Sequence, residues 1–413
     1  MTNTASKPGR VAITGAGPAG MAAAISIHQA GHEVAIFERY KEVKPAGNIL
    51  NLWPPPIKAL GLMGVDIVDF GAATLSEFHR ADGRLRAVVH LPEDVVRDWG
   101  GGFIGLTRPN LFRRLHSALP EDSLHTGKQL ADFTEDASGV HLSFSDGSTY
   151  DADVLVGADG IDSFVRKRLW GDAPKRDHNL LVLGGLSYNE IPGASHNRSV
   201  VSHDRTVQAS WTGIREAGES GYQWWVLSPF PGDTEFTGDI KKEAARIAHN
   251  FLSPFPELIA STDPELTQKW QIRDRPPLKQ WSKGRVTLVG DAAHSTSPYA
   301  AYGAGMATED GYYLGRKLAA LDLSNYAEVR EALQGFEEPR KPHTAFQSQM
   351  AFRLGRIFHH TPAPLRPIRD LVFDHTNFLQ KMIGETTPVE ILKQMDEIDI
   401  AEVDFRSKTG AVA

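Results

Sequence analysis

The sequence predicts an α/β fold, because three short apolar segments typical of buried strands each end in a glycine-containing turn. These segments cover residues 10–14, 152–156 and 286–289. The first is followed by an Ala-rich helical stretch at 19–30 and a strand-like run at 32–37, which complete a βαβ unit of about 30 residues. Units of this kind build Rossmann-like folds, so we expect one at the N-terminus.

The middle of the chain, from about residue 180 to 230, predicts a separate sheet because it is rich in aromatic and β-branched residues in alternation. Side chains alternate between the two faces of a strand, so Gln223 and Trp225 should share one face and Tyr222 and Trp224 the other. One of these faces is a candidate roof for a ligand site.

Helical patterns follow at residues 239–251 and 304–320. Residues 331–398 combine helical stretches with Pro-rich loops. We expect the last dozen residues to be frayed, as chain ends often are.

The composition is that of an ordinary globular protein of 413 residues. Its 44 Lys and Arg residues against 51 Asp and Glu residues give a formal net charge of −7, so we expect no general attraction to nucleic acid or anionic lipid. Cysteine is absent, which excludes disulfides, thiolate nucleophiles and iron–sulfur clusters, and we expect no metal site. The apolar stretch at 11–30 contains Pro18 and three glycines, so we expect a cytoplasmic protein without a membrane segment.

The first glycine-containing turn has the spacing of a dinucleotide-binding motif between a strand and a helix. Gly15 permits a tight turn, Gly17 lets the backbone approach a pyrophosphate, and Gly20 lets the helix pack on the sheet. Glu38, at the end of the next strand, is an acid that can accept hydrogen bonds from an adenosine ribose and would repel a 2′-phosphate. This pattern predicts FAD or NAD rather than NADP as the bound nucleotide.

The two later turns carry the resemblance to a family. Residues 157–166 read GADGIDSFVR, and residues 290–294 read GDAAH and are followed by Pro298. They resemble the Asp-Gly and Gly-Asp motifs of the class A FAD-dependent monooxygenases, the p-hydroxybenzoate hydroxylase-like aromatic hydroxylases. All three motifs occur in that family's order over residues 11–310. The resemblance implies a Rossmann-like FAD-binding domain of the glutathione-reductase type, with an inserted β-sheet substrate domain and C-terminal helices.

The resemblance also implies which residues bind FAD. Asp291 would hold the ribityl chain, Arg108 would reach the phosphates and ribityl chain, and the start of the helix near residue 303 would face the flavin N1 and O2 edge. The complete set of candidate cofactor residues is Gly15, Gly17, Pro18, Ala19, Gly20, Glu38, Arg39, Arg108, Asp159, Gly160, Arg166, Gly290, Asp291, Pro298, Gly303, Ala304 and Gly305.

Two segments depart from the family pattern where the flavin ring should lie. The usual Gly-Gln-Gly is Ala301-Tyr302-Gly303 here, so Tyr302 is placed to stack on or cap the ring. In the stretch 47–54, Ile49 replaces a glycine. Both departures change the lining of the site rather than its framework.

The family cycle, as implied by the resemblance, uses NAD(P)H and O2 to form a flavin C4a-hydroperoxide that hydroxylates an aromatic substrate, here a phenolic or polycyclic small molecule. No second glycine-rich motif exists for NAD(P)H, which the family binds only transiently. The catalytic base is not identified by the sequence. His294, Tyr302, Gln223 and Trp225 are the candidates, His203 and Asp204 are weaker ones, and each has a structural role as its alternative.

Several alternatives share this cofactor. The same chemistry can give epoxidation, N-hydroxylation or Baeyer–Villiger insertion, and flavin-dependent halogenases or a non-catalytic flavin-binding protein are further readings. We predict a discontinuous FAD-binding domain of residues 1–175 and 265–330, a substrate-binding sheet domain of 176–264 and a helical region of 331–413. The protein is expected to be a monomer or homodimer.

Overall fold

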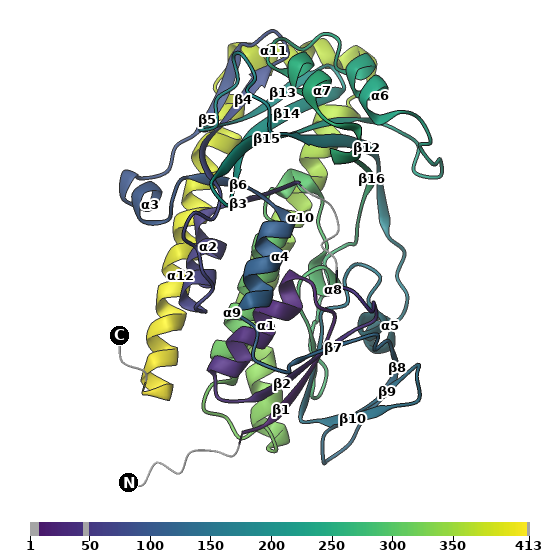
Figure 1. The fold of residues 1–413 in the computed structure, drawn as a ribbon, viewed down its shortest axis with the longest axis vertical. Coiled ribbons are helices and arrows are strands. Elements are labelled where there is room, and N and C mark those ends of the chain that lie inside the picture. Colours follow the sequence, from purple (N-terminus) through teal and green to yellow (C-terminus); the bar gives the residue numbers. More distant parts are fainter. Residues whose placement is uncertain (1–7, 44–48, 411–413) are drawn as a thin grey trace.

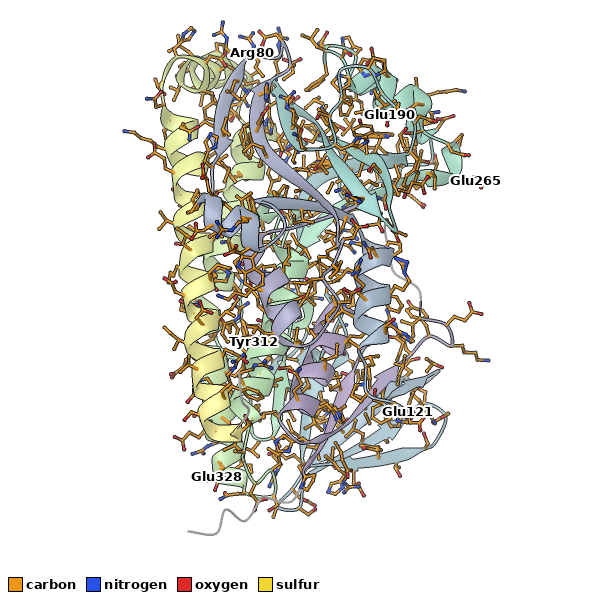
Figure 2. The ribbon with its side chains drawn as sticks, turned by 60° about the vertical axis from the view of Figure 1, so that its left-hand side comes forward. Arg80, Glu121, Glu190, Glu265, Tyr312 and Glu328 are labelled. Carbon is orange, nitrogen blue, oxygen red and sulfur yellow. The ribbon has the colours of Figure 1, made fainter. Side chains whose placement is uncertain are left out.

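The computed structural model describes residues 8–43 and 49–410. A parallel sheet lies toward one end of an elongated molecule and a large mixed sheet lies at the other, with helices running between them along the long axis (Figure 1). Arg80 and Glu328 mark the opposite ends of this axis, and Tyr312 lies near its middle (Figure 2).

The strands are β1 (Arg10–Thr14), β2 (Glu33–Glu38), β3 (Ile49–Leu52), β4 (Ala72–Arg80), β5 (Leu85–Val89), β6 (Phe103–Thr107), β7 (Leu124–Thr126), β8 (Leu130–Glu135), β9 (Val140–Phe144), β10 (Thr149–Ala152), β11 (Val154–Gly157), β12 (Arg176–Ser187), β13 (Arg198–Asp204), β14 (Val207–Glu216), β15 (Glu219–Pro229), β16 (Thr267–Asp274) and β17 (Val286–Leu288). The α-helices are α1 (Pro18–Gln29), α2 (Pro54–Leu62), α3 (Glu93–Asp98), α4 (Arg108–Ser117), α5 (Phe164–Trp170), α6 (Ile240–Ile247), α7 (Phe255–Ser261), α8 (Asp291–His294), α9 (Gly303–Leu318), α10 (Tyr326–His359), α11 (Arg366–His375) and α12 (Thr386–Thr409). Short helical turns are η1 (Pro264–Leu266), η2 (Pro298–Ala300), η3 (Ala363–Leu365) and the π-helical η4 (Gln380–Glu385).

The parallel sheet has the strand order β17-β11-β1-β2-β7. The three apolar segments of the sequence form three adjacent parallel strands, β1, β11 and the edge strand β17, so their glycine-containing turns meet at the carboxyl ends of these strands. Helices α1 and α9 pack closely together: Gly311 of α9 lies against the α1 backbone at Ala22 and Ala23, where any side chain would collide. The predicted Rossmann-like α/β fold is thereby confirmed.

The mixed sheet has nine strands, ordered β16-β12-β15-β14-β13-β4-β6-β3 with β5 beside β4. One face carries Trp211, Tyr222 and Trp224 and packs against α6 and α7 in a separate hydrophobic cluster. The other face carries Trp225 and turns toward the helices that connect the two sheets. The expected division of faces within β15 is therefore confirmed.

This sheet takes strands from two parts of the chain. Five of them, β12–β16, come from residues 176–274, and the other four, β3–β6, come from residues 49–107. Strands from both sides of residue 175 therefore share one sheet. The division of the chain into domains at that residue remains a prediction.

The C-terminal region differs from its prediction in two ways. Helix α10 continues for 34 residues through Pro339 and Pro342, where Pro-rich loops were expected. Buried Phe336, Arg340 and Thr344 hold this segment by tertiary contacts, which outweigh the backbone hydrogen bonds that the prolines remove. Of the last dozen residues, 402–409 are helical, since α12 extends to Thr409 along the side of the molecule (Figure 1), and 411–413 lie outside the described residues.

Candidate functional site

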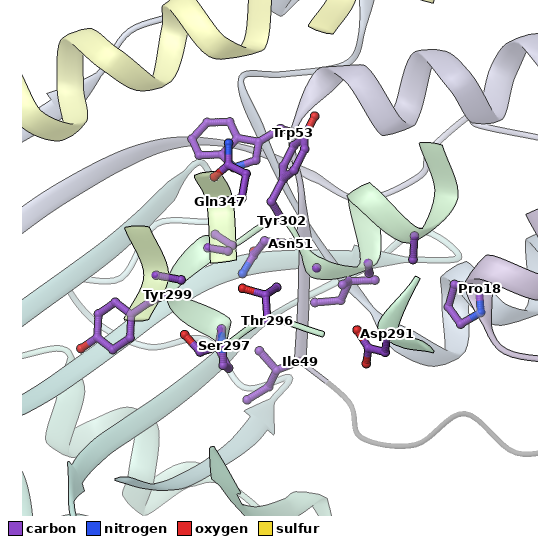
Figure 3. Close-up of a pocket in the computed structure, with 18 of the residues that line it drawn as sticks. Pro18, Ile49, Asn51, Trp53, Asp291, Thr296, Ser297, Tyr299, Tyr302 and Gln347 are labelled. Atoms are coloured by element: carbon purple, nitrogen blue, oxygen red, sulfur yellow. The ribbon is translucent and has the colours of Figure 1, made fainter. Parts of the chain in front are cut away.

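A single cavity of about 590 Å³ runs from the glycine-rich turn of β1 to the inner face of the nine-stranded sheet. Figure 3 shows Pro18 and Asp291 toward one end and Tyr299 at the other, with Asn51, Thr296 and Ser297 between them. We call the part near Pro18 and Asp291 the nucleotide cradle and the part between the sheet and helix α10 the substrate lobe.

The glycine-rich turn has the conformation that its motif requires. Gly15 has a φ of +100°, and a Cβ there would lie 2.4 Å from the carbonyl oxygen of Ala158. A Cβ on Gly20 would lie 2.0 Å from the Gly15 oxygen, whereas one on Gly17 would meet nothing within 4 Å. Helix α1 begins at Pro18 with no side-chain cap, so its first N–H groups are available to a phosphate in the cavity.

The acidic residue predicted for the ribose lies next to this turn. Glu38 lines the cavity, and its two oxygens accept hydrogen bonds from the backbone N–H of Ala16 (2.9 Å) and of Tyr40 (3.0 Å). Each carboxylate oxygen retains a further lone pair for a ribose hydroxyl. Arg39 is exposed, lies over the Tyr40 ring and is not among the residues that line the cavity.

Asp291 and Arg108 line the cavity where a ribityl chain is expected. Both side chains are exposed to the cavity, and partial desolvation by the surrounding protein raises the pKa of Asp291, while the charge of Arg108 acts in the opposite direction. The same desolvation lowers the pKa of Arg108. Gly290 has a φ of +59°, which favours glycine, and its N–H donates to Asp310 (2.9 Å). This anchor holds the turn that presents Asp291.

The Asp-Gly segment contributes mainly backbone. Gly160 lines the cavity, and a Cβ there would meet nothing within 4 Å. Asp159 accepts hydrogen bonds from the N–H groups of Phe164 (2.7 Å) and Val165 (3.2 Å), so it holds the start of α5. Arg166 is buried with one guanidinium nitrogen unpartnered, and burial lowers its pKa to about 10. Neither of these two side chains is among the residues that line the cavity.

The segment from Ser295 to Gly305 forms the wall between the cradle and the substrate lobe. The buried hydroxyls of Ser295, Thr296 and Ser297 make no hydrogen bond within the described residues. Pro298, Gly303 and Ala304 line the cavity, and Gly305 instead packs against Pro56. Helix α9 begins at Gly303 without a side-chain cap, so its N–H groups face this wall unpaired by side chains.

These features fit FAD. The cradle offers open space where Gly17 and Gly160 lack a side chain, uncapped starts of α1 and α9, and buried hydroxyl groups without partners. A two-part ligand with a pyrophosphate at one end and a hydrogen-bonding ring at the other would satisfy all of them.

Tyr302 and His294 belong to a buried ionic network. The Tyr302 hydroxyl donates to Glu309 (2.5 Å), and burial raises the pKa of this phenol well above its ordinary value. His294 contacts Asp310 at 2.5 Å, and Arg340 pairs with both Glu309 and Asp310 at 2.9 Å. His294 is not among the residues that line the cavity, whereas Tyr302 is. The network braces α9 against α10, and catalytic roles for these two residues remain untested.

Gln223 and Trp225 lie on the cavity side of β15. The Gln223 amide accepts from the N–H of Leu50 (3.0 Å) and donates to the Leu50 carbonyl (2.8 Å) and the Asn51 side chain (2.9 Å). Gln223 therefore holds β3 in place, and Ile49, Leu50 and Asn51 of that strand line the cavity. Trp225 also lines the cavity. Residues 47 and 48 of the resembling stretch lie outside the described residues. Among the weaker candidates, His203 stacks on Phe358 with ring centroids 3.7 Å apart, and Asp204 contacts Asn250 at 3.3 Å.

The sequence did not identify the contribution of the C-terminal helices to the substrate lobe. Their lining residues include His343, Gln347, Met350, Leu354, Phe358, Met382, Ile383, Glu390, Ile391 and Gln394. Helical periodicity marks a buried face on such helices, but it does not reveal that the face borders a cavity.

No helix in the described ranges 8–43 and 49–410 is both long and apolar enough to cross a membrane. In the same ranges no three His, Asp or Glu side chains are grouped so that they can hold a metal ion.

The fold and cavity define a flavoprotein with a Rossmann-like FAD-binding domain. A family model described as FAD binding domain matches residues 109–345, and a second model of that description matches residues 10–46. The chain belongs to this FAD-binding family, and its predicted class, the class A FAD-dependent aromatic monooxygenases, is confirmed.

The chain is similar to characterised hydroxylases along most of its length. It is 29% identical over 386 residues to 3-amino-4-hydroxybenzoate 2-monooxygenase PtmB3 of Streptomyces platensis, covering 90% of this chain and 93% of that protein. It is 28% identical to the FAD-dependent urate hydroxylase of Klebsiella pneumoniae, covering 73% and 79%. The structure of Klebsiella pneumoniae HpxO with FAD and uric acid has the same fold, with a TM-score of 0.80, 24% identity and coverage of 93% and 96%.

Proposed function

We propose that the protein is an FAD-dependent monooxygenase that uses NAD(P)H and O2 to hydroxylate an aromatic small molecule. The observation that carries this proposal is the continuity of one cavity, which joins a nucleotide cradle to an aromatic-lined lobe beneath a sheet. The named activities of the similar proteins, which are a 3-amino-4-hydroxybenzoate 2-monooxygenase and an FAD-dependent urate hydroxylase, support the same reaction class.

FAD, when bound, would accept electrons from NAD(P)H and activate O2. The residues proposed to hold its phosphates are those of the glycine-rich turn and the start of α1. Asp291 would accept hydrogen bonds from ribityl hydroxyls, and Arg108 beside it would balance its charge. The uncapped start of α9 would stabilise negative charge on the nearby ring edge.

The substrate lobe would exclude water and orient the ring that is attacked. Its walls are the apolar side chains Val182, Trp225 and Leu227 from the sheet and Leu354 and Phe358 from α10. Water exclusion matters because a reactive oxygen donor that meets water is lost as peroxide. Residues 1–175 and 265–330 are proposed to supply the cradle, and 176–264 the roof of the lobe.

The experiment is anaerobic reduction of the FAD-loaded protein followed by admission of O2. NADH or NADPH should bleach the visible flavin band, faster with a bound aromatic ligand, and O2 should then yield a product with one added oxygen atom. Product mass and NMR would separate ring hydroxylation from epoxidation, N-hydroxylation or Baeyer–Villiger insertion. A flavin that neither reductant bleaches, with or without ligand, would contradict the proposal.

The reductant NAD(P)H is a coenzyme of the cell interior, so we propose that the enzyme works in the cytoplasm. Cell fractionation with activity measured in each fraction tests this location. The state as monomer or homodimer remains a prediction, which sedimentation would test.

A further inference from the structure

The substrate lobe contains few charged groups. Among the described residues that line the whole cavity, the only Lys or Arg side chain is Arg108, and it lies in the nucleotide cradle beside Asp291. The lining histidine, His343, is held neutral because burial lowers its pKa to about 2. A carboxylate placed under the sheet would therefore lose its hydration without gaining a cationic partner from these residues.

The far end of the lobe is built around Tyr299, a residue of η2 in the motif that follows β17. Its ring lines the cavity and lies parallel to the Phe358 ring, with centroids 6.2 Å apart and an interplanar angle of 7°. Its hydroxyl contacts Nε2 of His359, the next residue of α10. Tyr299 is thus held from two sides by adjacent residues of one helix.

The hydrogen-bond direction at Tyr299 follows from the other nitrogen of His359. Nδ1 lies 2.6 Å from the carbonyl oxygen of Thr206, and a carbonyl can only accept, so Nδ1 carries the proton. Burial lowers the pKa of His359 to about 4, so the ring is neutral and Nε2 has no proton. The Tyr299 hydroxyl must then donate to Nε2. Its remaining lone pairs can only accept a hydrogen bond from another group.

Two neighbouring strands supply more polar groups. Ser199 of β13 lines the cavity, is fully buried, and its hydroxyl has no hydrogen-bond partner. Gln208 of β14 also lines the cavity and is 5% exposed. Its amide nitrogen donates to Ser210 Oγ (2.9 Å), which leaves the amide oxygen as the group available to His203 or to the cavity. Buried polar groups of this kind ordinarily have partners, so a ligand is expected to supply one.

We propose, on the basis of the proposed function, that the substrate is an uncharged aromatic compound that donates a hydrogen bond from a hydroxyl or ring N–H group. The Tyr299 oxygen, oriented by His359, accepts that hydrogen bond, and Ser199 contacts a second polar group of the substrate. This chain thereby differs from the similar enzyme whose named substrate is a benzoate. His359 is a positioning residue, because it acts on the substrate through Tyr299.

The first test compares matched ligands on the FAD-loaded wild-type protein. The set is methyl 3-hydroxybenzoate, its carboxylate counterpart 3-hydroxybenzoate and its donor-free counterpart methyl 3-methoxybenzoate, together with the corresponding two-ring naphthalene compounds. Dissociation constants come from the change in flavin absorbance and from calorimetry. We expect the neutral donor to bind at least about tenfold more tightly than the carboxylate. The methoxy compound should also bind about tenfold more weakly than the neutral donor, because one lost hydrogen bond in a buried site lowers affinity by roughly that factor.

The second test uses Tyr299→Phe, with Tyr188→Phe as a matched control at a half-exposed position outside the cavity. Tyr299→Phe should weaken the neutral donor about tenfold and leave the methoxy compound unchanged, which a merely structural role of Tyr299 would not do. His359→Gln should give a similar but smaller loss, because the Tyr299 proton becomes free to reorient. FAD content and thermal midpoint show that each variant is folded, and Ser199→Ala repeats the test should Tyr299→Phe not retain FAD.

Tighter binding of the carboxylate in either ring series would overturn the inference. So would equal loss of the donor and methoxy ligands in Tyr299→Phe, or no binding by any neutral donor. These outcomes are separate from failure of the proposed function, because a protein that hydroxylates 3-hydroxybenzoate remains a monooxygenase and loses only the proposed substrate class. A flavin that NAD(P)H never reduces removes the function instead.

Discussion

The nucleotide cradle is lined mainly by backbone groups, and the substrate lobe is lined mainly by side chains. The backbone of the cradle comes from short turns that contain Gly17 and Gly160 and from the start of α9. The lobe presents side chains such as Trp225 and Phe358, which come from strands and helices more than 100 residues apart. A backbone site restricts its sequence to glycine and small residues, whereas a side-chain site accepts many combinations that fill the same volume.

The largest effect is expected where a side chain enters the backbone-lined cradle. Gly15→Ala places a Cβ 2.4 Å from the Ala158 oxygen at a φ of +100°, so the turn must move and FAD retention should be lost. Gly31→Ala is the control, because Gly31 has a similar φ of +92° and open space around its Cβ position. The measurement is the ratio of flavin to protein absorbance after purification. Full FAD content in Gly15→Ala would refute this account of the turn.

The next effect concerns the ionic network that joins the two regions. Arg340→Met removes the partner of two buried carboxylates, Glu309 and Asp310, and should lower the free energy of unfolding by about 3–5 kcal/mol. Arg330→Met, at an exposed position of the same helix, should change it by less than about 0.5 kcal/mol. Urea unfolding followed by circular dichroism measures both. A small loss in Arg340→Met would mean that the carboxylates can be hydrated or protonated without cost.

Substitutions of the two adjacent tryptophans of β15 should affect different properties, stability for Trp224 and ligand affinity for Trp225. Trp224 is fully buried and its Nε1 donates to Thr262 Oγ1 (2.8 Å), so Trp224→Phe should cost about 2 kcal/mol of stability. Trp225→Phe, on the cavity face, should cost less stability and should instead change the affinity for aromatic ligands. Unfolding midpoints and ligand titrations of both variants check this. Equal stability losses with unchanged affinity would show that both side chains serve only the core.

The last effect, which is absent at neutral pH, is the pH dependence contributed by the lobe. Burial lowers the pKa of His343 to about 2, whereas an unfolded histidine titrates near 6.5. Between these values the unfolded state binds the proton and the folded state does not, so the free energy of unfolding falls as the pH falls below about 6.5. One proton contributes a slope of up to about 1.4 kcal/mol per pH unit. His343→Gln should reduce the slope of the unfolding free energy between pH 6 and 4, and an unchanged slope would contradict the prediction.

Much of the framework could be predicted from sequence because its requirements are local. Strand, glycine turn and helix follow one another within residues 10–38, and each glycine has a steric reason that is independent of the rest of the chain. The faces of β15 were also predictable, because alternation is a property of a single strand. The roles of Asp159, Arg166 and Gly305 in binding were inferred from a motif. Only the tertiary structure shows that Asp159 holds the start of α5, that Arg166 is not among the residues lining the cavity and that Gly305 lies against Pro56.

Helix α10 illustrates what local signals could not decide. Pro339 and Pro342 favour a break, yet Arg340 between them is held by two carboxylates of α9 and the helix continues to His359. That continuation is what brings His359 to Tyr299, some 60 positions away in the sequence, and so creates the acceptor at the end of the lobe.

The sequence by itself determined the α/β class, the dinucleotide turn and the family, since these depend on residue types at fixed short spacings. The tertiary structure alone decided which side chains line the substrate lobe, which carboxylates pair with Arg340, and which atom accepts the hydrogen bond that Tyr299 donates. The physical reason is that burial and hydrogen-bond direction depend on neighbours that arrive from distant parts of the chain, and no local pattern specifies them.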